Sequence, residues 1–254
     1  MILYLHMHKC AGTSVVRAAA ASGLRLPAQH QNGNLIAADD RPIKYRGMPS
    51  ADLAALLDRQ SDAGVQFMAM EWDFPRPEQF AGTRALRTFT SLRDPLARAI
   101  SNFRMDKVAG HIDPAVRFGD YINGDALYCS DNYYVKMLCQ LWPKDHATPA
   151  DLAFAMDVLA SFEAVIVIEQ ANMPQVLARF GITPEATRHN AFHADPAHDP
   201  SGEDPRLWIS DHEIRDFIAR NTLDYALYCH CTRAIRLADR SRPCVQDARN
   251  LIGG

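Results

Sequence analysis

The first fourteen residues of the chain constrain its fold more than any other stretch. Residues 1–5 are mostly apolar and predict a buried strand, the segment that ends at Gly12 predicts a tight turn, and a helix is expected from Thr13. The first backbone amides of such a helix have no partner within it, and its dipole is positive at this end. Lys9 adds a charge, and the hydroxyls of Thr13 and Ser14 add donors. The sequence therefore predicts an anion site, with phosphate as the expected ligand.

The lysine of this turn stands before the glycine, at Lys9, and not after it. In the Walker A loop of ATPases and kinases, the lysine follows a glycine directly. An ordinary ATPase or kinase loop is therefore not indicated.

A second strand-to-helix junction follows further along the chain. Residues 86–92 predict a strand, and Arg93 stands directly after it. Asp94 can cap a helix and Pro95 suits the first helical position, so Ser101 is expected on the side of the helix that faces its start. A guanidinium can bind phosphate oxygens in a bidentate manner, so this junction predicts a second phosphate site.

Other side chains near these junctions are expected to be structural. Arg98 and Arg104 are interpreted as a solvated face of the helix that follows Pro95. Tyr133 and Tyr134 lie in a predicted helix, where packing in the core is favoured over stacking on a nucleotide base.

A carboxylate and two aromatic residues follow the strand predicted at residues 65–70. Open α/β sheets bind ligands at the carboxyl ends of their strands, where Glu71, Trp72, Asp73 and Phe74 are expected. The residues alone leave two interpretations open. In the first, the aromatic side chains belong to the core and Glu71 is a solvated charge of a loop. In the second, the segment forms part of a ligand site.

These segments resemble the motifs of sulfotransferases that use 3′-phosphoadenosine 5′-phosphosulfate (PAPS). Residues 8–14, HKCAGTS, are similar to the loop that binds the 5′-phosphosulfate, with His8 where proline is usual. Residues 93–103, RDPLARAISNF, resemble the 3′-phosphate motif, in which serine follows arginine by eight positions. Residues 70–74, MEWDF, correspond to the segment of the heparan-type enzymes that holds a catalytic glutamate, without its preceding lysine.

The resemblance implies a three-layer α/β/α P-loop-like fold with a central parallel sheet, in which the third strand lies beside the first. A single sulfotransferase-like domain is expected over residues 1–238, followed by a poorly ordered tail at residues 239–254. The implied reaction is in-line transfer of the sulfuryl group from PAPS to an acceptor hydroxyl on a carbohydrate, which leaves 3′-phosphoadenosine 5′-phosphate (PAP). A phenol or a lipid headgroup remains an alternative acceptor.

The resemblance also assigns roles to particular residues. Glu71 would be the catalytic base, with Asp73 as a possible substitute, and Lys9 would neutralise the leaving phosphate. The implied acceptor-binding residues are Trp72, Asp73, Phe74 and Arg76. The implied cofactor-binding residues are Lys9, Cys10, Ala11, Gly12, Thr13, Ser14, Arg93, Ser101, Arg188 and Asn190, the last two in a long loop that covers the cofactor.

Composition narrows the remaining possibilities. A net charge of −3 and a pI near 6.3 argue against bulk attraction to nucleic acid. No apolar run approaches the roughly 18 to 20 residues that span a bilayer, and no signal peptide is indicated, so a cytoplasmic protein is expected.

Two groups of residues have metal-like spacing, Cys229-His230-Cys231 and the alternating His6, His8 and Cys10. No further ligands stand nearby in sequence, so no metal is expected. The oligomeric state is not indicated.

Two other functions remain open from the sequence. A nucleotide-dependent kinase would share the fold and the anion loop, although it would be expected to carry a Walker A motif. A binding module without catalytic activity would use the same pocket to sense an adenine nucleotide.

Overall fold

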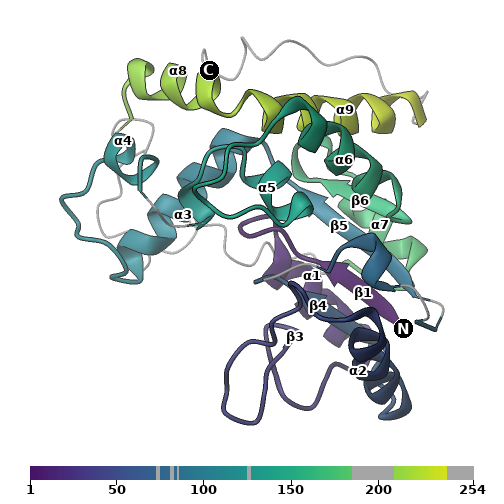
Figure 1. The fold of residues 1–254 in the computed structure, drawn as a ribbon. Coiled ribbons are helices and arrows are strands. Elements are labelled where there is room, and N and C mark those ends of the chain that lie inside the picture. Colours follow the sequence, from purple (N-terminus) through teal and green to yellow (C-terminus); the bar gives the residue numbers. More distant parts are fainter. Residues whose placement is uncertain (73–74, 81–82, 85, 125–126, 185–208, 239–254) are drawn as a thin grey trace.

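The computed structural model describes residues 1–72, 75–80, 83–84, 86–124, 127–184 and 209–238. These residues form an α/β fold around a six-stranded sheet with the order β2-β3-β4-β1-β5-β6 (Figure 1). The strands are β1 (Ile2–Leu5), β2 (His30–Gln31), β3 (Asn34–Leu35), β4 (Phe67–Met70), β5 (Arg87–Leu92) and β6 (Ala164–Val167).

Nine α-helices are assigned within the described residues, together with three short 3₁₀ segments. The α-helices are α1 (Gly12–Ala21), α2 (Ser50–Asp62), α3 (Pro95–Val108), α4 (Phe118–Tyr121), α5 (Tyr133–Cys139), α6 (Pro149–Ala160), α7 (Met173–Arg179), α8 (Asp211–Arg220) and α9 (Thr222–Ala238). The 3₁₀ segments are η1 (Pro77–Phe80), η2 (Leu127–Cys129) and η3 (Ile168–Gln170).

The central strands run parallel, as the alternation of strands and helices predicts. β1 pairs with β4 on one side and with β5 on the other, so the predicted third strand does lie beside the first. β6 continues the parallel sheet beyond β5, and β3 pairs parallel with β4. The exception is the short β2, which pairs antiparallel with β3. The sequence did not predict this pair of strands, because residues 24–49 have no steady hydrophobic period.

Helices pack against both faces of the central strands. Alternate residues of β1 belong to two different buried clusters, since successive side chains of a strand point to opposite faces. Leu3 and Leu5 pack in a cluster with α2, α5, α6 and α9, and Ile2 and Tyr4 pack in one with α1 and α7. Every residue of β1 and β4 is buried, as expected for parallel strands covered on both sides.

A third apolar cluster lies beside the sheet. It joins α3, α4 and α8 through residues such as Phe103, Phe118 and Phe217. In Figure 1, α3 and α4 extend to the left of the sheet. This cluster holds α3 in the position from which it borders the pocket described below.

The turn between β1 and α1 has a strained backbone. Lys9 and Ala11 both adopt left-handed φ angles, of 63° and 65°, which non-glycine residues rarely do. The helix starts at Gly12, one residue before the predicted start, and Ala11 provides no side-chain cap. The first amides of α1 therefore lack the intramolecular acceptor that a Ser or Asp cap would supply.

Gly12 is required by the ring that packs against it. A Cβ atom added at Gly12 would lie 1.9 Å from Cε1 of His6, far inside van der Waals contact. The glycine of the loop thus gives space to a buried side chain that extends from the end of β1.

We predict that Gly12→Ala destabilises the protein by about 1 to 3 kcal/mol, the usual cost of overpacking a core. Urea unfolding measures the change. His6→Ala removes the ring. The loss of stability in the double variant should therefore be smaller than the sum of the losses in the two single variants. Additive costs would show that the His6 ring is not what Gly12 accommodates.

Candidate functional site

Three chain segments meet at one edge of the sheet. In the registers of β1, Leu5 is aligned with Met70 of β4 and with Thr90 of β5. Parallel strands end at the same edge, so the turn after β1, Glu71 after β4 and Arg93 after β5 lie together. Lys9, Glu71 and Arg93 are therefore at the carboxyl ends of the central strands, the edge at which α/β proteins bind ligands.

Hydroxyl groups of the core hold the turn after β1 in place. The Cys10 carbonyl accepts hydrogen bonds from Ser91 Oγ at 2.7 Å and from Tyr4 Oη at 3.3 Å. Cys10 is completely buried, and burial raises the pKa of its thiol to about 12. The thiol is therefore neutral and inaccessible, and the Cys10 amide donates to the Met7 carbonyl at 3.1 Å.

A single buried hydroxyl connects the two predicted phosphate-binding segments. Tyr134 Oη lies 3.3 Å from Cys10 Sγ. The same oxygen donates to the Arg93 carbonyl at 2.8 Å and accepts from the Arg93 amide at 3.1 Å. The turn before α1 and the junction before α3 are thus positioned by one side chain.

Tyr133 and Tyr134 are fully buried, which confirms the prediction that they belong to the core. Their helix α5 is capped by Asp224 of α9, whose two carboxylate oxygens accept from the amides of Tyr134 and Val135 at 3.0 Å each. Burial raises the pKa of Asp224 to about 6. α9 thereby fixes the helix that positions both loops.

The Glu71 carboxylate contacts two histidines of the turn. His8 Nδ1 is hydrogen-bonded to Glu71 Oε1 at 2.8 Å, and His6 Nδ1 lies 3.3 Å from Oε2 without the alignment of a hydrogen bond. Burial alone would raise the pKa of Glu71, but His6 and His8 outweigh it and hold that pKa well below its usual range. Glu71 is only 8% exposed, so its interpretation as a solvated loop charge is wrong.

His8 itself is held on several sides. Its ring stacks on Tyr128 with the centroids 4.1 Å apart, and its backbone amide donates to Tyr133 Oη at 3.1 Å. Burial lowers the pKa of the imidazole, against the opposing effect of Glu71. The second ring nitrogen, Nε2, is buried and has no hydrogen-bond partner within the described residues.

Lys9 lies in the same charged environment. Burial lowers the pKa of its ammonium group, Glu71 raises it, and Arg93 lowers it further. The lysine and the arginine are thus close enough to affect one another, as two groups that share one polyanionic ligand would be.

The junction after β5 agrees with its predicted geometry. Asp94 caps α3 by accepting from the Ala97 amide at 2.9 Å, with Pro95 at the first helical position. Arg93 Nε is 3.8 Å from Glu169 Oε1. Glu169 also accepts from the Asp94 amide and from Tyr228 Oη, each at 3.0 Å. The sequence did not identify Glu169 as part of this site, although it stands directly after the apolar run that forms β6.

Arg98 contradicts its predicted exposure. Its side chain is 2% exposed, lies over the Tyr133 ring at 4.0 Å, and donates from Nη2 to the Tyr128 carbonyl at 3.0 Å. Arg104 is also only partly exposed. The helix pattern suggested a solvated face because it contains no information about η2 and α5, which cover this side of α3. Ser101 is partly buried on the same helix.

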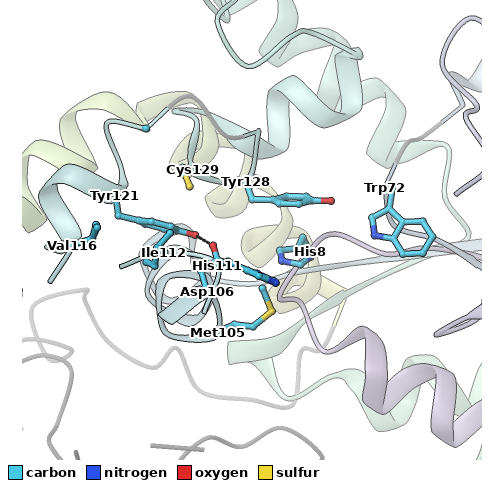
Figure 2. Close-up of a pocket in the computed structure, with 11 residues that line it drawn as sticks. His8, Trp72, Met105, Asp106, His111, Ile112, Val116, Tyr121, Tyr128 and Cys129 are labelled. Carbon is cyan, nitrogen blue, oxygen red and sulfur yellow. Dashed lines mark hydrogen bonds and ion pairs between the residues drawn. The ribbon is translucent and has the colours of Figure 1, made fainter. Parts of the chain in front are cut away.

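A pocket of about 500 Å³ opens beside His8. Figure 2 shows His8 beneath Tyr128, with Trp72 on one side and Asp106 on the other. The remaining lining residues come from α3, α4 and the segments around them: Met105, His111, Ile112, Val116, Tyr121, Gly124 and Cys129. Trp72, one of the predicted acceptor-binding residues, is thus part of the pocket wall.

The other predicted acceptor and lid residues do not reach this pocket or cannot be placed. Arg76 is exposed and donates to the Cys139 carbonyl at 3.4 Å, away from the pocket lining. Asp73, Phe74, Arg188, Asn190 and the tail at residues 239–254 lie outside the described residues.

The sequence did not identify the two histidines of the turn, His6 and His8, as part of the site. Their alternation in His6-Met7-His8 was the available signal. Their acidic partner, Glu71, stands 63 positions after His8 and comes near through strand pairing. Even so, the described part of the chain contains no group of three or more His, Cys, Asp or Glu side chains placed to hold a metal ion.

The sequence matches no model of a known protein family and none of the curated proteins. None of the helices within the described residues has the length and apolar character needed to cross a bilayer.

Glu71 should make stability depend on pH in a defined direction. A lowered pKa in the folded protein means that the carboxylate stabilises the fold above its ordinary pKa of 4.5, and that this contribution is lost as the pH falls. We expect Glu71→Gln to lower the free energy of unfolding by about 1 to 3 kcal/mol at pH 7. This difference between the two proteins should become smaller as the pH falls from 5 to 3.

Urea unfolding of both proteins across this pH range checks the expectation. Glu163→Gln is the control, because Glu163 pairs with Arg87 at the surface, where ion pairs contribute little. A difference between wild type and Glu71→Gln that stays constant with pH would contradict the lowered pKa of Glu71.

Proposed function

We propose that the protein is a PAPS-dependent sulfotransferase with a P-loop-like three-layer fold. One observation carries the proposal. The turn at Lys9 and the junction at Arg93 are adjacent, and Tyr134 binds both. Two linked anion sites suit a nucleotide with phosphates at both ends of one adenosine, which PAPS has and ATP lacks.

The residues of the first segment are suited to the 5′-phosphosulfate. The N-cap residue of α1 supplies no side-chain acceptor, and the positive end of the helix dipole favours an anion at this position. The Lys9 ammonium and the Thr13 and Ser14 hydroxyls would add donors there.

The second segment is suited to the 3′-phosphate. Arg93 is about one-third exposed, and its Nε atom is buried without a hydrogen-bond partner within the described residues. A phosphate would supply the acceptor that this nitrogen lacks, with the Ser101 hydroxyl of α3 as a further donor.

PAPS supplies an activated sulfuryl group, and the chain has to position it and stabilise charge. Like phosphoryl transfer, this chemistry makes few covalent demands on the protein. Lys9 neutralises charge on the leaving phosphate, and the buried setting strengthens that interaction. The pocket beside His8 would hold the acceptor, with Trp72 in its wall.

Nucleotide preference distinguishes this proposal from its alternatives. We expect PAP to raise the melting temperature more than AMP or magnesium-ATP does, because a ligand that binds the folded state alone stabilises it. A larger shift with magnesium-ATP would favour a kinase. Binding of PAP without sulfuryl transfer in a broad acceptor screen, together with full tolerance of Glu71→Ala, would favour a sensing module.

Arg93→Ala should weaken PAP binding by about 10- to 100-fold, the effect of losing one charged hydrogen-bonding group. AMP has no 3′-phosphate, so its affinity should not change, and calorimetry with both ligands measures the contrast. Arg87→Ala is the matched control, because Arg87 lies at the other end of β5 and pairs with Glu163. Unchanged PAP affinity in Arg93→Ala would remove the 3′-phosphate assignment.

A further inference from the structure

The contacts of Glu71 make it a poor candidate for the group that takes a proton from the acceptor. One of its oxygens is hydrogen-bonded to His8 Nδ1, and the other faces His6. Glu71 does not line the pocket, whereas His8 does. A carboxylate whose pKa is held low is also a weak base.

His8 lines the pocket, and its ring is held in one orientation. Its Nδ1 faces a carboxylate, which favours the tautomer with the proton on Nδ1 and leaves Nε2 with a lone pair. Stacking on Tyr128 and the bond from the His8 amide to Tyr133 restrict movement of the ring. Nε2 is the ring atom that has no partner within the described residues.

We infer that His8 is the catalytic base of the proposed sulfuryl transfer and that Glu71 is its positioning residue. This inference rests on the proposed function. It assigns the proton to a residue of the phosphate-binding turn itself, whereas the sequence resemblance implied Glu71.

The step is balanced without a further reactant. The acceptor oxygen forms a bond to sulfur as the bond between sulfur and the bridging phosphate oxygen breaks. The hydroxyl proton goes to His8 Nε2, and the electron pair of the broken bond leaves with PAP. Glu71 stabilises the resulting imidazolium, which then returns its proton to water.

The charges around the ring are compatible with this role. Burial, Lys9 and His6 lower the pKa of His8, and Glu71 raises it. The Tyr128 and Tyr133 groups that contact His8 carry no charge at neutral pH, because burial raises the pKa of each. Asp106 and His111 line the same pocket on its α3 side.

The pocket beside the base indicates the class of acceptor. Its polar groups largely satisfy one another, since Asp106 accepts from Tyr121 Oη at 2.5 Å and lies 3.1 Å from His111 Nδ1. Much of the remaining wall is apolar, including Met105, Ile112, Val116 and the Trp72 ring. An acceptor with an apolar body, a phenol or an aliphatic alcohol, fits such a wall better than a sugar with many hydroxyls, which would leave polar groups unpaired.

The tautomer of His8 tests the inference without any acceptor. In the full-length ¹⁵N-labelled protein, His8→Asn identifies the His8 signals. We expect Nδ1 to carry the proton and Nε2 to be unprotonated at pH 7.5, with a shift toward the Nε2-protonated tautomer in Glu71→Gln. A proton on Nε2 in the wild-type protein at this pH would overturn the assignment.

Transfer assays test the same residue in turnover. PAP release from PAPS is measured with phenols, aliphatic alcohols and monosaccharides as acceptors. His8→Asn should lower the rate by about 10²- to 10⁴-fold and keep PAP affinity within about threefold, because general-base catalysis has that magnitude. His212→Asn is the matched control, since His212 is an exposed histidine that also contacts a carboxylate, Asp216, at 2.9 Å.

The outcomes separate this inference from the proposed function. A wild-type protein that transfers sulfate while His8→Asn is equally active overturns the inference alone. Preferred transfer to monosaccharides overturns the acceptor class. A wild-type protein that does not bind PAP, or that transfers to no acceptor, overturns the proposed function and the inference with it.

Discussion

The parallel pairing of β1 with β4 and β5 is the constraint on which the rest of the site depends. Each strand alone ends in an ordinary polar segment. Once Leu5 is aligned with Met70 and Thr90, the three segments meet, and groups distant in sequence come within bonding distance. A slip of one residue would turn β1 over and move Leu5 to the opposite face, so the buried clusters on the two faces also fix the site.

The sequence predicted those parts of the fold that depend on local pattern. The strands β1, β4, β5 and β6, the cap by Asp94 and the start of α3 at Pro95 all follow from short apolar runs and cap residues. The burial of Arg98, the contact of Glu71 with two histidines and the role of Glu169 depend on long-range packing. No periodicity within one segment carries that information.

Buried polar groups define the position of the loops at some cost in stability. Arg98 is enclosed by aromatic rings, with Nη2 bonded to a carbonyl, and Asp224 is fully desolvated as it caps α5. Desolvation of such charges is expensive, and apolar replacements often stabilise proteins. In this protein the same groups hold α5, and α5 supplies the tyrosines that position both segments predicted to bind phosphate. The buried polar groups thus favour one arrangement of the loops. An apolar core would be more stable but would define that arrangement less well.

The same network is compatible with a histidine at the position where the sulfotransferase loops that the sequence resembles have proline. Proline would fix φ at this position but has no amide hydrogen, so it could not donate to Tyr133. Here His8 donates that hydrogen bond, and the Cys10 carbonyl is held by Ser91 and Tyr4. These contacts offset the strain of the left-handed φ at Lys9 without the rigidity of a proline ring. Because contacts from the core hold the turn, position 8 can carry an imidazole, which faces the carboxylate of Glu71 directly after β4.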